Sequence, residues 1–319
     1  MMTNKIYADT PENIKKAAEV IKNGGLVAFP TDTVYGLGAN VYDAKAVASI
    51  FAAKQRPAFD PLISHIANID FLPEYAVVDS RVMDLAKYFW PGPLTFVLQR
   101  KDNNPALDLV CSGLPNIAVR MPNHQLALDL INASGVPIAA PSANKFKHIS
   151  PTTAHHVADG LVNEVDMILD GGACKIGVET TIIDLTSSQI VILRAGGLSK
   201  EELEDFMGEK ITLSKGNSET PSAPGQLLKH YAPKIPLRIN VLPHEVKVNE
   251  FYIGFGNTPD ANLNLSTKGD LNEAASNLFA YMRIAEAQSE YPAIAIAPIP
   301  QIGLGLAIND RITRASYKE

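Results

Sequence analysis

The sequence predicts an α/β protein, with an open, twisted, mixed β-sheet and flanking helices, followed by a small C-terminal α/β domain. Helical and strand patterns alternate over the first two-thirds of the 319-residue chain, as they do in α/β sheets. A polar segment rich in Pro and Ser interrupts this alternation over 214–236, and the alternation resumes beyond it. We therefore expect a larger domain over 1–213, a linker over 214–236 and a small domain over 237–319.

The first helix and strand follow from capping and periodicity. Thr10 can cap a helix with Pro11 at its first position, and apolar residues recur at helical spacing, at Ile14, Ala17, Ala18 and Ile21. Two glycines, at 24 and 25, end this helix. A short buried strand is predicted over 26–29, and the turn-forming residues of 30–38 predict a loop after it.

The same alternation predicts the other elements of the larger domain. Helices are expected over 43–54, 82–89, 126–131 and 200–207. Strands are expected over 62–66, 94–98, 117–121, 137–140, 167–169, 181–185 and 190–193.

The small domain is predicted by a shorter run of the same signals. Strands are expected over 237–242, 251–255 and 293–297, and helices over 271–287 and 303–316. Since a unit of about eighty residues can bury little core by itself, we expect it to lean on the larger domain.

Composition limits the class of protein. The net charge is 28 − 34 = −6, whereas a dedicated nucleic-acid coat needs a basic face. The chain has only two cysteines and no CxxC, which favours a reducing, cytoplasmic environment. The N-terminus lacks the apolar core of a signal peptide, and the longest apolar stretch, 293–308, is broken by Pro and Gly. We therefore expect a cytoplasmic protein without a membrane span.

Several familiar motifs are missing. The chain has no Walker-type phosphate loop and no G-x-S-x-G nucleophile elbow. Gly303-Leu304-Gly305 begins like a dinucleotide fingerprint, but Ile308 occupies the position of the third glycine. The histidines and cysteines show no metal-ligand spacing, so no structural metal is predicted.

Polar residues do, however, follow several of the predicted strands. They occur in Pro30–Leu37, Lys54-x-Arg56, Arg120, Ser142-x-Asn144, Glu179-Thr180-Thr181 and Arg194. Each has an ordinary explanation, as a turn, a helix cap or a cation at a helix C-terminus. Because ligands bind at strand ends in open α/β sheets, the set together predicts one anion-binding crevice.

These motifs occur in a characteristic order. The series PTDTVYGL, KQRP followed by DPLISH, AVRMP, APSAN, SPTT, ETTIIDL and ILRAG resembles that of the YrdC-type threonylcarbamoyl-AMP synthases. The tail, with APGQLLKHYAP and GLGLAINDRITRA, resembles the longer, two-domain branch of that family. The resemblance extends over nearly the whole chain, from Tyr7 to Ala315.

The resemblance implies a reaction. L-Threonine, bicarbonate (or CO2) and ATP would give threonylcarbamoyl-adenylate and pyrophosphate, with Mg2+ accompanying the triphosphate. The product would feed a downstream threonylcarbamoyl-transferase complex that modifies adenosine in certain tRNAs. The threonine carbamate and ATP are both anionic, so a crevice rich in cations suits this chemistry.

The resemblance also implies roles for individual residues. Those expected to line the threonine pocket are Thr33, His65, Arg120, Ala140 and Thr180, with Arg120 pairing with the carboxylate. Those expected to contact ATP are Arg56, Asp60, Asn116, Ser142, Ser150, Arg194 and Tyr231. The pairs Lys54 with Arg56 and Ser142 with Asn144 mark the catalytic site, and no residue is expected to ligate a metal.

Three of these residues have a second interpretation. Asp60 stands where the family more often has Asn, and its carboxylate is unfavourable near phosphates unless it helps to hold Mg2+ or faces away. Tyr231 should reach back from the linker and make it a lid, or else dock as an ordinary aromatic residue. His65 could equally be a buried structural histidine.

Two other functions remain open at this point. A concave cationic face could bind double-stranded RNA or tRNA without catalysis, although the acidic balance and the lack of RNA-type motifs count against it. Related domains form carbamoyl-adenylate from carbamoyl phosphate, but the chain lacks the Cys-rich zinc modules found with them.

Overall fold

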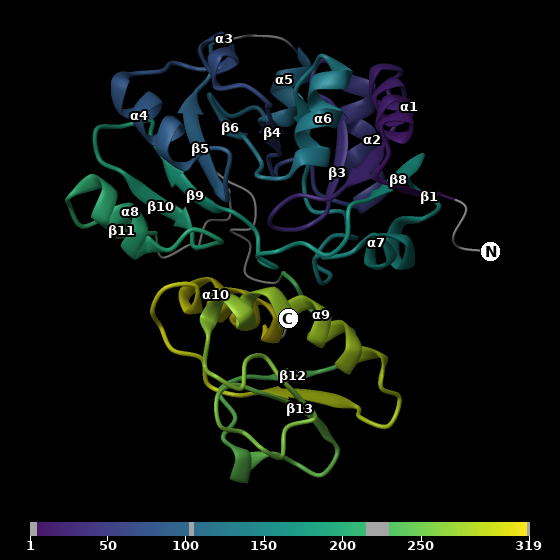
Figure 1. Ribbon diagram of the computed structural model, residues 1–319, viewed down its shortest axis with the longest axis vertical. Helices are drawn as coiled ribbons and strands as arrows, with labels where there is room; N and C mark the ends of the chain where they lie inside the picture. The colour runs from purple at the N-terminus through teal and green to yellow at the C-terminus, as the bar shows by residue number, and fades with distance from the viewer. Residues whose placement is uncertain (1–4, 102–104, 215–229, 318–319) are drawn as a thin grey trace.

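The protein consists of a larger and a smaller α/β unit, shown in the computed structural model of Figure 1. The structure describes residues 5–101, 105–214 and 230–317. None of the helices in these ranges is long and apolar enough to cross a membrane.

A mixed sheet forms the centre of the larger unit. Its described strands lie in the order β1-β8-β2-β3-β7-β4-β6-β5-β9-β10-β11. Their bounds, in that order, are Ile6–Ala8, Met167–Asp170, Val27–Phe29, Gly36–Asn40, Ile138–Ala139, Ile63–His65, Asn116–Arg120, Leu94–Gln99, Thr181–Asp184, Val191–Arg194 and Thr212–Leu213. Parallel and antiparallel pairs alternate irregularly: β4 runs parallel to β6, for example, whereas β7 runs antiparallel to β4.

Helices cover both faces of one half of this sheet. Val27 and Phe29 of β2 pack with α1 (Pro11–Lys22) and α6 (Gln125–Ser134), whereas Ala28 faces the largest apolar cluster. Six further helices contribute buried side chains to that cluster: α2 (Ala44–Lys54), α3 (Leu72–Tyr75), α4 (Ser80–Phe89), α5 (Pro105–Val110), α7 (Ala154–Leu161) and α8 (Lys200–Met207). Two short 3-10 turns also occur, Ile69–Phe71 in the larger unit and Pro243–Glu245 in the smaller one.

The face that carries α1 and α6 continues over the other half of the sheet. There Ile63, Val97, Ala118 and Ile182 form a small apolar cluster of their own. Alternate residues on these strands, such as His65 and Arg120, share this face. Polar side chains are therefore placed beside an apolar floor.

The smaller unit has a wholly parallel sheet, in the order β12-β15-β13-β14. Its strands are Leu237–Arg238, Ala293–Ile296, Glu250–Gly254 and Leu263–Asn264, and its helices are α9 (Leu271–Ala287) and α10 (Gly305–Ser316). Figure 1 shows both helices on the side of this sheet that faces the larger unit. The apolar cluster around these helices includes Val34, Ile149 and Val178 of the larger unit. The small unit therefore packs against the larger one, as expected for its size.

Most of the predicted helices and strands are confirmed, but β3 was missed. The segment 30–38, predicted as a loop, contains the start of β3, which pairs antiparallel with β2 and β7. Gly36 and Gly38 weaken its strand signal. A Cβ at Gly38 would lie 2.7 Å from the Phe29 ring and 2.8 Å from Ile138, so packing between strands requires glycine there.

Other differences concern short elements. The strand predicted over 237–242 is only the two-residue β12, and β1, β11, β14, α3 and α5 were not predicted. The prediction also missed α7, although Thr153 caps it and its buried residues have helical spacing, at Ala154, Val157, Ala158 and Leu161. Strands of two or three residues are too short to show a period.

Candidate functional site

A long connection crosses the larger sheet and forms one wall of the site. β8 and β9 are consecutive in the chain, yet six strands separate them in the sheet. The segment between them, 171–180 (the crossing segment), runs past the end of β2, where the Ile176 amide donates to Asp32 O (2.9 Å) and the Gly177 amide to Thr33 O (3.1 Å). It then reaches Glu179, whose carbonyl accepts from the Gly197 amide (2.9 Å).

A pocket that is partly open to solvent lies at this point. Every residue predicted for threonine lines it: Thr33, His65, Arg120, Ala140 and Thr180. Of those predicted for ATP, Arg56, Ser142, Arg194 and Tyr231 line it as well. The structure therefore brings together residues from the ends of several strands, as the sequence pattern predicted for a shared crevice.

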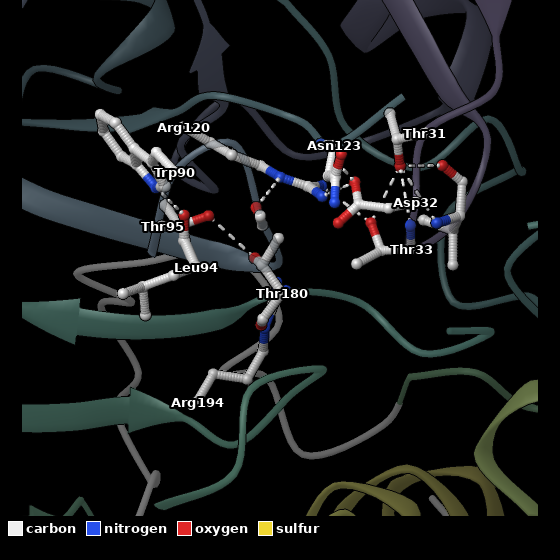
Figure 2. Close-up of polar contacts among 12 residues, drawn as sticks. Thr31, Asp32, Thr33, Trp90, Leu94, Thr95, Arg120, Asn123, Thr180 and Arg194 are labelled. Atoms are coloured by element: carbon white, nitrogen blue, oxygen red, sulfur yellow. Dashed lines mark hydrogen bonds and ion pairs between the residues drawn. The ribbon is translucent and has the colours of Figure 1, made fainter. Parts of the chain in front are cut away.

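Arg120 is held rigidly at one end of this pocket (Figure 2). Its Nη1 donates to Thr33 Oγ1 at 2.8 Å, its Nε donates to the Gly92 carbonyl at 3.2 Å, and its Nη2 forms an ion pair with Asp32. The Asn123 amide also donates to Asp32, at 3.1 Å. Buried ion pairs need this kind of additional hydrogen bonding to offset the desolvation of both charges.

The Thr33 hydroxyl is fixed by the turn in which it lies. Its Oγ1 is 2.9 Å from Thr31 Oγ1, and the Thr31 hydroxyl donates to the Val34 carbonyl at 2.7 Å. This Thr-Asp-Thr turn therefore satisfies its own backbone, as the ordinary explanation has it, and also anchors Arg120.

A chain of polar contacts leads from the sheet to Arg194. Thr95 donates to Thr180 Oγ1 at 2.8 Å, and Arg194 Nη2 donates to the same oxygen at 2.9 Å. Arg194 also donates to the Thr180 carbonyl, from Nε at 3.2 Å and Nη2 at 3.0 Å. Since the Thr180 hydroxyl accepts both side-chain bonds, its own hydrogen remains for a third partner (Figure 2).

His65 lies in the pocket wall as a neutral side chain. Its ring meets Phe29 edge-on at 6.3 Å between centroids, and its Nδ1 is 3.2 Å from the Ile63 carbonyl. Burial, followed by repulsion from Arg120, lowers the pKa of His65 to about 3. The imidazole is therefore uncharged at neutral pH, which avoids a second cation beside Arg120.

Asp60 faces Arg56. Its Oδ1 lies 2.8 Å from Arg56 Nη2, and the carboxylate is fully buried. Arg56 further donates to the carbonyls of Asp60 (3.1 Å) and Pro61 (2.9 Å). The Asp60 carboxylate is thus engaged by the guanidinium and does not line the pocket, which corresponds to the interpretation in which it faces away from phosphates.

Lys54 and Asn144 lie behind the pocket wall. The Nζ of Lys54 donates to the carbonyls of Ser142 and Asn144, each at 2.5 Å. Asn144 Nδ2 in turn donates to the carbonyls of Lys145 and His148, each at 2.8 Å. Both side chains therefore shape the loop that presents Ser142, and neither lines the pocket.

Ser150 and Asn116 are also outside the pocket lining. Ser150 donates to Glu179 Oε1 at 2.5 Å, so it adjoins a residue that does line the pocket. Asn116 begins β6, and alternation puts it on the same face as Ala118 and Arg120, about 13 Å along the strand from Arg120.

The linker prediction can be followed only at its end, because 215–229 lie outside the described residues. His230 and Tyr231 both line the pocket, with ring centroids 4.0 Å apart. Tyr231 is buried and also stacks on Phe279 of α9, at 5.6 Å. Tyr231 therefore contacts the pocket and the small unit at once.

Sequence reasoning assigned no role to Asp32, Glu179, His230 or Arg311. Asp32 and Glu179 belong to motifs that were singled out, but only the fold shows that each pairs with a buried arginine, Arg120 and Arg311 respectively. Arg311 and Glu179 are 132 positions apart, so no local spacing could connect them. His230 could have been found only as the neighbour of Tyr231.

Metal-ligating side chains do not cluster in the described part of the site. Within the described ranges no three His, Cys, Asp or Glu side chains gather as a metal site. Three carboxylates lie nearby and each is paired with an arginine: Asp32 with Arg120, Asp60 with Arg56, and Glu179 with Arg311. The described side chains therefore do not form a cage that would hold Mg2+ by themselves.

Comparison with known proteins connects this geometry to a family. Residues 19–196 match a family model described as telomere recombination, and residues 198–316 match one described as threonylcarbamoyl-AMP synthase, C-terminal domain. The chain is 41% identical to the threonylcarbamoyl-AMP synthase of Pyrococcus abyssi, over 95% of this chain and 94% of that protein. It is 38% identical to the one of Bacillus subtilis, over 99% and 96% respectively.

A solved structure agrees with the sequence matches. The fold superposes on a crystal structure of the P. abyssi protein complexed with L-threonine, with a TM-score of 0.90 and 39% identity. The match covers 98% of this chain and 97% of that chain, so it includes both units and the pocket between their elements. The chain therefore belongs to the threonylcarbamoyl-AMP synthase family, in its two-domain form.

Proposed function

We propose that this protein makes threonylcarbamoyl-AMP and pyrophosphate from L-threonine, bicarbonate (or CO2) and ATP, and that it does so in the cytoplasm. The observation that carries the proposal is the convergence of Thr33, Arg120 and Thr180 in one pocket, next to the cations Arg56 and Arg194. The two threonine hydroxyls and Arg120 can bind the hydroxyl and the carboxylate of an amino acid. The two cations Arg56 and Arg194 can bind a triphosphate.

Threonine is held at the Arg120 end of the pocket. A guanidinium has five N–H groups, and the contacts to Gly92, Thr33 and Asp32 use one on each nitrogen. One N–H on each terminal nitrogen is therefore left for the substrate carboxylate. The remaining hydrogen of the Thr180 hydroxyl serves the polar groups of the same substrate.

ATP lies across the adjoining cations and the apolar floor. Arg56, Arg194 and Ser142 face the phosphates, and Tyr231 covers them from the linker. Asn116 lies on the same sheet face, so the nucleoside end extends toward it over Ala118. Asp60 orients Arg56 instead of contacting ATP. Ser150 acts with Glu179 at the edge of the site.

The chemistry then follows from proximity. The neutral threonine amine attacks CO2, and the carbamate oxygen attacks the α-phosphorus of ATP as pyrophosphate leaves. His65 is a weak base because its pKa is about 3, so positioning and charge compensation carry the reaction in place of a strong general base. Mg2+ bound to the triphosphate would help to neutralise its charge, and the described residues contribute no ligand cluster for it.

The product is a reactive mixed anhydride, so a second enzyme must take it up. We place the protein upstream of a threonylcarbamoyl-transferase complex that modifies adenosine in tRNA. Lys54 and Asn144 support this reaction indirectly, by fixing the loop of Ser142.

Pyrophosphate release by the purified protein tests the proposal. We expect release from Mg-ATP only when threonine and bicarbonate are both present, and none when carbamoyl phosphate replaces them. Release with carbamoyl phosphate would instead identify a carbamoyl-adenylate-forming enzyme. Salt-sensitive RNA binding without turnover would identify a nucleic-acid-binding module.

A further inference from the structure

An arginine of the small unit reaches the pocket wall of the larger one. Arg311 lies on α10 and is completely buried. Its Nε donates to Glu179 Oε2 at 2.7 Å, and its Nη1 donates to Asp310 Oδ2 at 2.6 Å. The ion pair with Glu179 thus joins α10 to the crossing segment, and Glu179 lines the pocket.

Glu179 is an unfavourable residue for a site that binds two anions. Its carboxylate would repel phosphates and a carbamate in a medium of low polarity. Burial by itself raises the pKa of Glu179, but the charges of Arg311 and Arg194 outweigh this and leave the pKa below its usual value. The group is therefore ionised, and Arg311 supplies the compensating charge from outside the pocket.

Glu179 passes this restraint on to Ser150. Its Oε1 accepts the Ser150 hydroxyl at 2.5 Å while its Oε2 is held by Arg311. A carboxylate fixed at both oxygens has one orientation, so the position of the Ser150 hydroxyl depends on Arg311.

Arg311 also restrains Tyr231. Its guanidinium carbon lies 5.1 Å from the centroid of the Tyr231 ring, within the range of a cation–π contact. The Tyr231 ring also stacks on Phe279 of α9. Tyr231 has φ of +62°, a conformation that a non-glycine residue keeps only when its surroundings hold it.

We propose that Arg311 is a positioning residue for ATP, acting through Glu179 and Tyr231, and that this is how the small domain contributes to the reaction. The inference rests on the proposed function, because it assigns Ser150 and Tyr231 to the nucleotide. Threonine is held by Arg120, whose described partners are Gly92, Thr33 and Asp32 and include neither Arg311 nor Glu179. Loss of Arg311 should therefore lower ATP affinity and leave threonine affinity nearly unchanged.

The test is to measure ATP and L-threonine affinity separately in the full chain, by calorimetry, for Arg311→Met. We expect ATP affinity to fall about tenfold, the usual size of a coupling through a contact network, and threonine affinity to stay within about twofold. The matched control is Arg238→Met, which removes an arginine–glutamate pair inside the small unit (Arg238 Nη1 to Glu250 Oε1, 2.8 Å). This control should leave both affinities unchanged.

A second variant covers the case in which Arg311→Met does not fold, since it leaves buried carboxylates uncompensated. Glu179→Gln combined with Arg311→Met removes both charges of the pair, and should fold and bind ATP more tightly than Arg311→Met. Arg311→Lys keeps the positive charge but cannot donate to Glu179 and Asp310 at once. Its ATP affinity should therefore lie between those of the wild type and Arg311→Met.

Two outcomes would overturn the inference. One is wild-type ATP affinity in a folded Arg311→Met protein, and the other is an equal loss of both affinities, which would indicate a structural role only. Failure of the proposed function is distinguishable: the wild type would then bind ATP but release no pyrophosphate with threonine and bicarbonate.

Discussion

The two ends of the pocket are built differently. The threonine end (Thr33, His65, Arg120, Ala140, Thr180) and the described side chains that fix it, such as Asp32 and Thr95, all come from the larger unit. The nucleotide end (Arg56, Ser142, Ser150, Arg194, Tyr231) depends on the linker and, through Arg311, on the small unit. In the proposed assignment, the side chains for the amino acid therefore come from one domain, whereas the nucleotide end is assembled from two.

The largest effect is expected at the threonine end, from Arg120→Ala. Truncation of a buried, hydrogen-bonded charge pair costs about 4 kcal/mol, or about a thousandfold in kcat/KM for threonine. ATP affinity should persist. Threonine-dependent pyrophosphate release and ATP calorimetry provide the measurement. Asp32→Asn combined with Arg120→Ala removes the carboxylate that would be left unpaired, and so controls for misfolding. Unchanged threonine affinity in Arg120→Ala would contradict the role of Arg120.

The contact between domains can be broken sterically with Gly177→Ala. A Cβ at this position would lie 2.5 Å from both the Ala275 carbonyl and the Ser276 Cα of α9. We expect overpacking to lower the free energy of unfolding by about 2 kcal/mol. ATP affinity should fall, and threonine affinity should fall with it, because the Gly177 amide donates to Thr33 O at 3.1 Å.

Gly172→Ala is the matched control for that variant. It lies on the same crossing segment with the same φ of +81°, but its Cβ would meet nothing within 4 Å. It should lose a little stability through backbone strain and keep both affinities. Equal behaviour of the two alanine variants would mean that domain contact is irrelevant to the nucleotide end.

A smaller effect is expected from Tyr231→Ala. Removal of the ring takes away one wall of the nucleotide end, and kcat/KM for ATP should fall about tenfold with the fold intact, a loss of about 1.4 kcal/mol. Tyr231→Phe keeps the ring, the Phe279 stack and the Arg311 contact, so it should retain most of the activity. Wild-type kinetics in Tyr231→Ala would remove the lid from the mechanism.

The smallest effect concerns the neutral state of His65. Its pKa is about 3 in the fold and 6.5 in the unfolded chain, so the unfolded chain takes up the proton first as pH falls. The contribution of the neutral His65 to the free energy of unfolding is full above pH 6.5 and decreases as pH falls. The decrease is about 1 kcal/mol between pH 6.5 and 5.5. His65→Gln should flatten the pH dependence of urea unfolding over this window, and an unchanged slope would contradict a neutral, buried imidazole.

The same contrast explains what the sequence could predict. The residues of the proposed threonine end lie at or next to strand ends, so strand prediction brought Thr33, Arg120 and Thr180 toward one crevice. His65 and Ala140 were named only through the family resemblance. Arg311 and Glu179 form a pair only because α10 docks on the crossing segment, and no local pattern encodes this contact. In β3, the glycines that tertiary packing requires hid the strand itself. These two misses depend on contacts between distant parts of the chain, whereas α7 was missed despite its local cap and spacing.

The path of the crossing segment sets the order in which the protein can be assembled. Since 171–180 spans six strands of the sheet, it can settle only after those strands have paired, and pairings between distant strands form slowly. Arg311 is synthesised after every described strand of the large sheet. A ribosome-bound chain thus acquires the threonine end first. The nucleotide end is completed last, when α10 docks on the crossing segment and Arg311 meets Glu179.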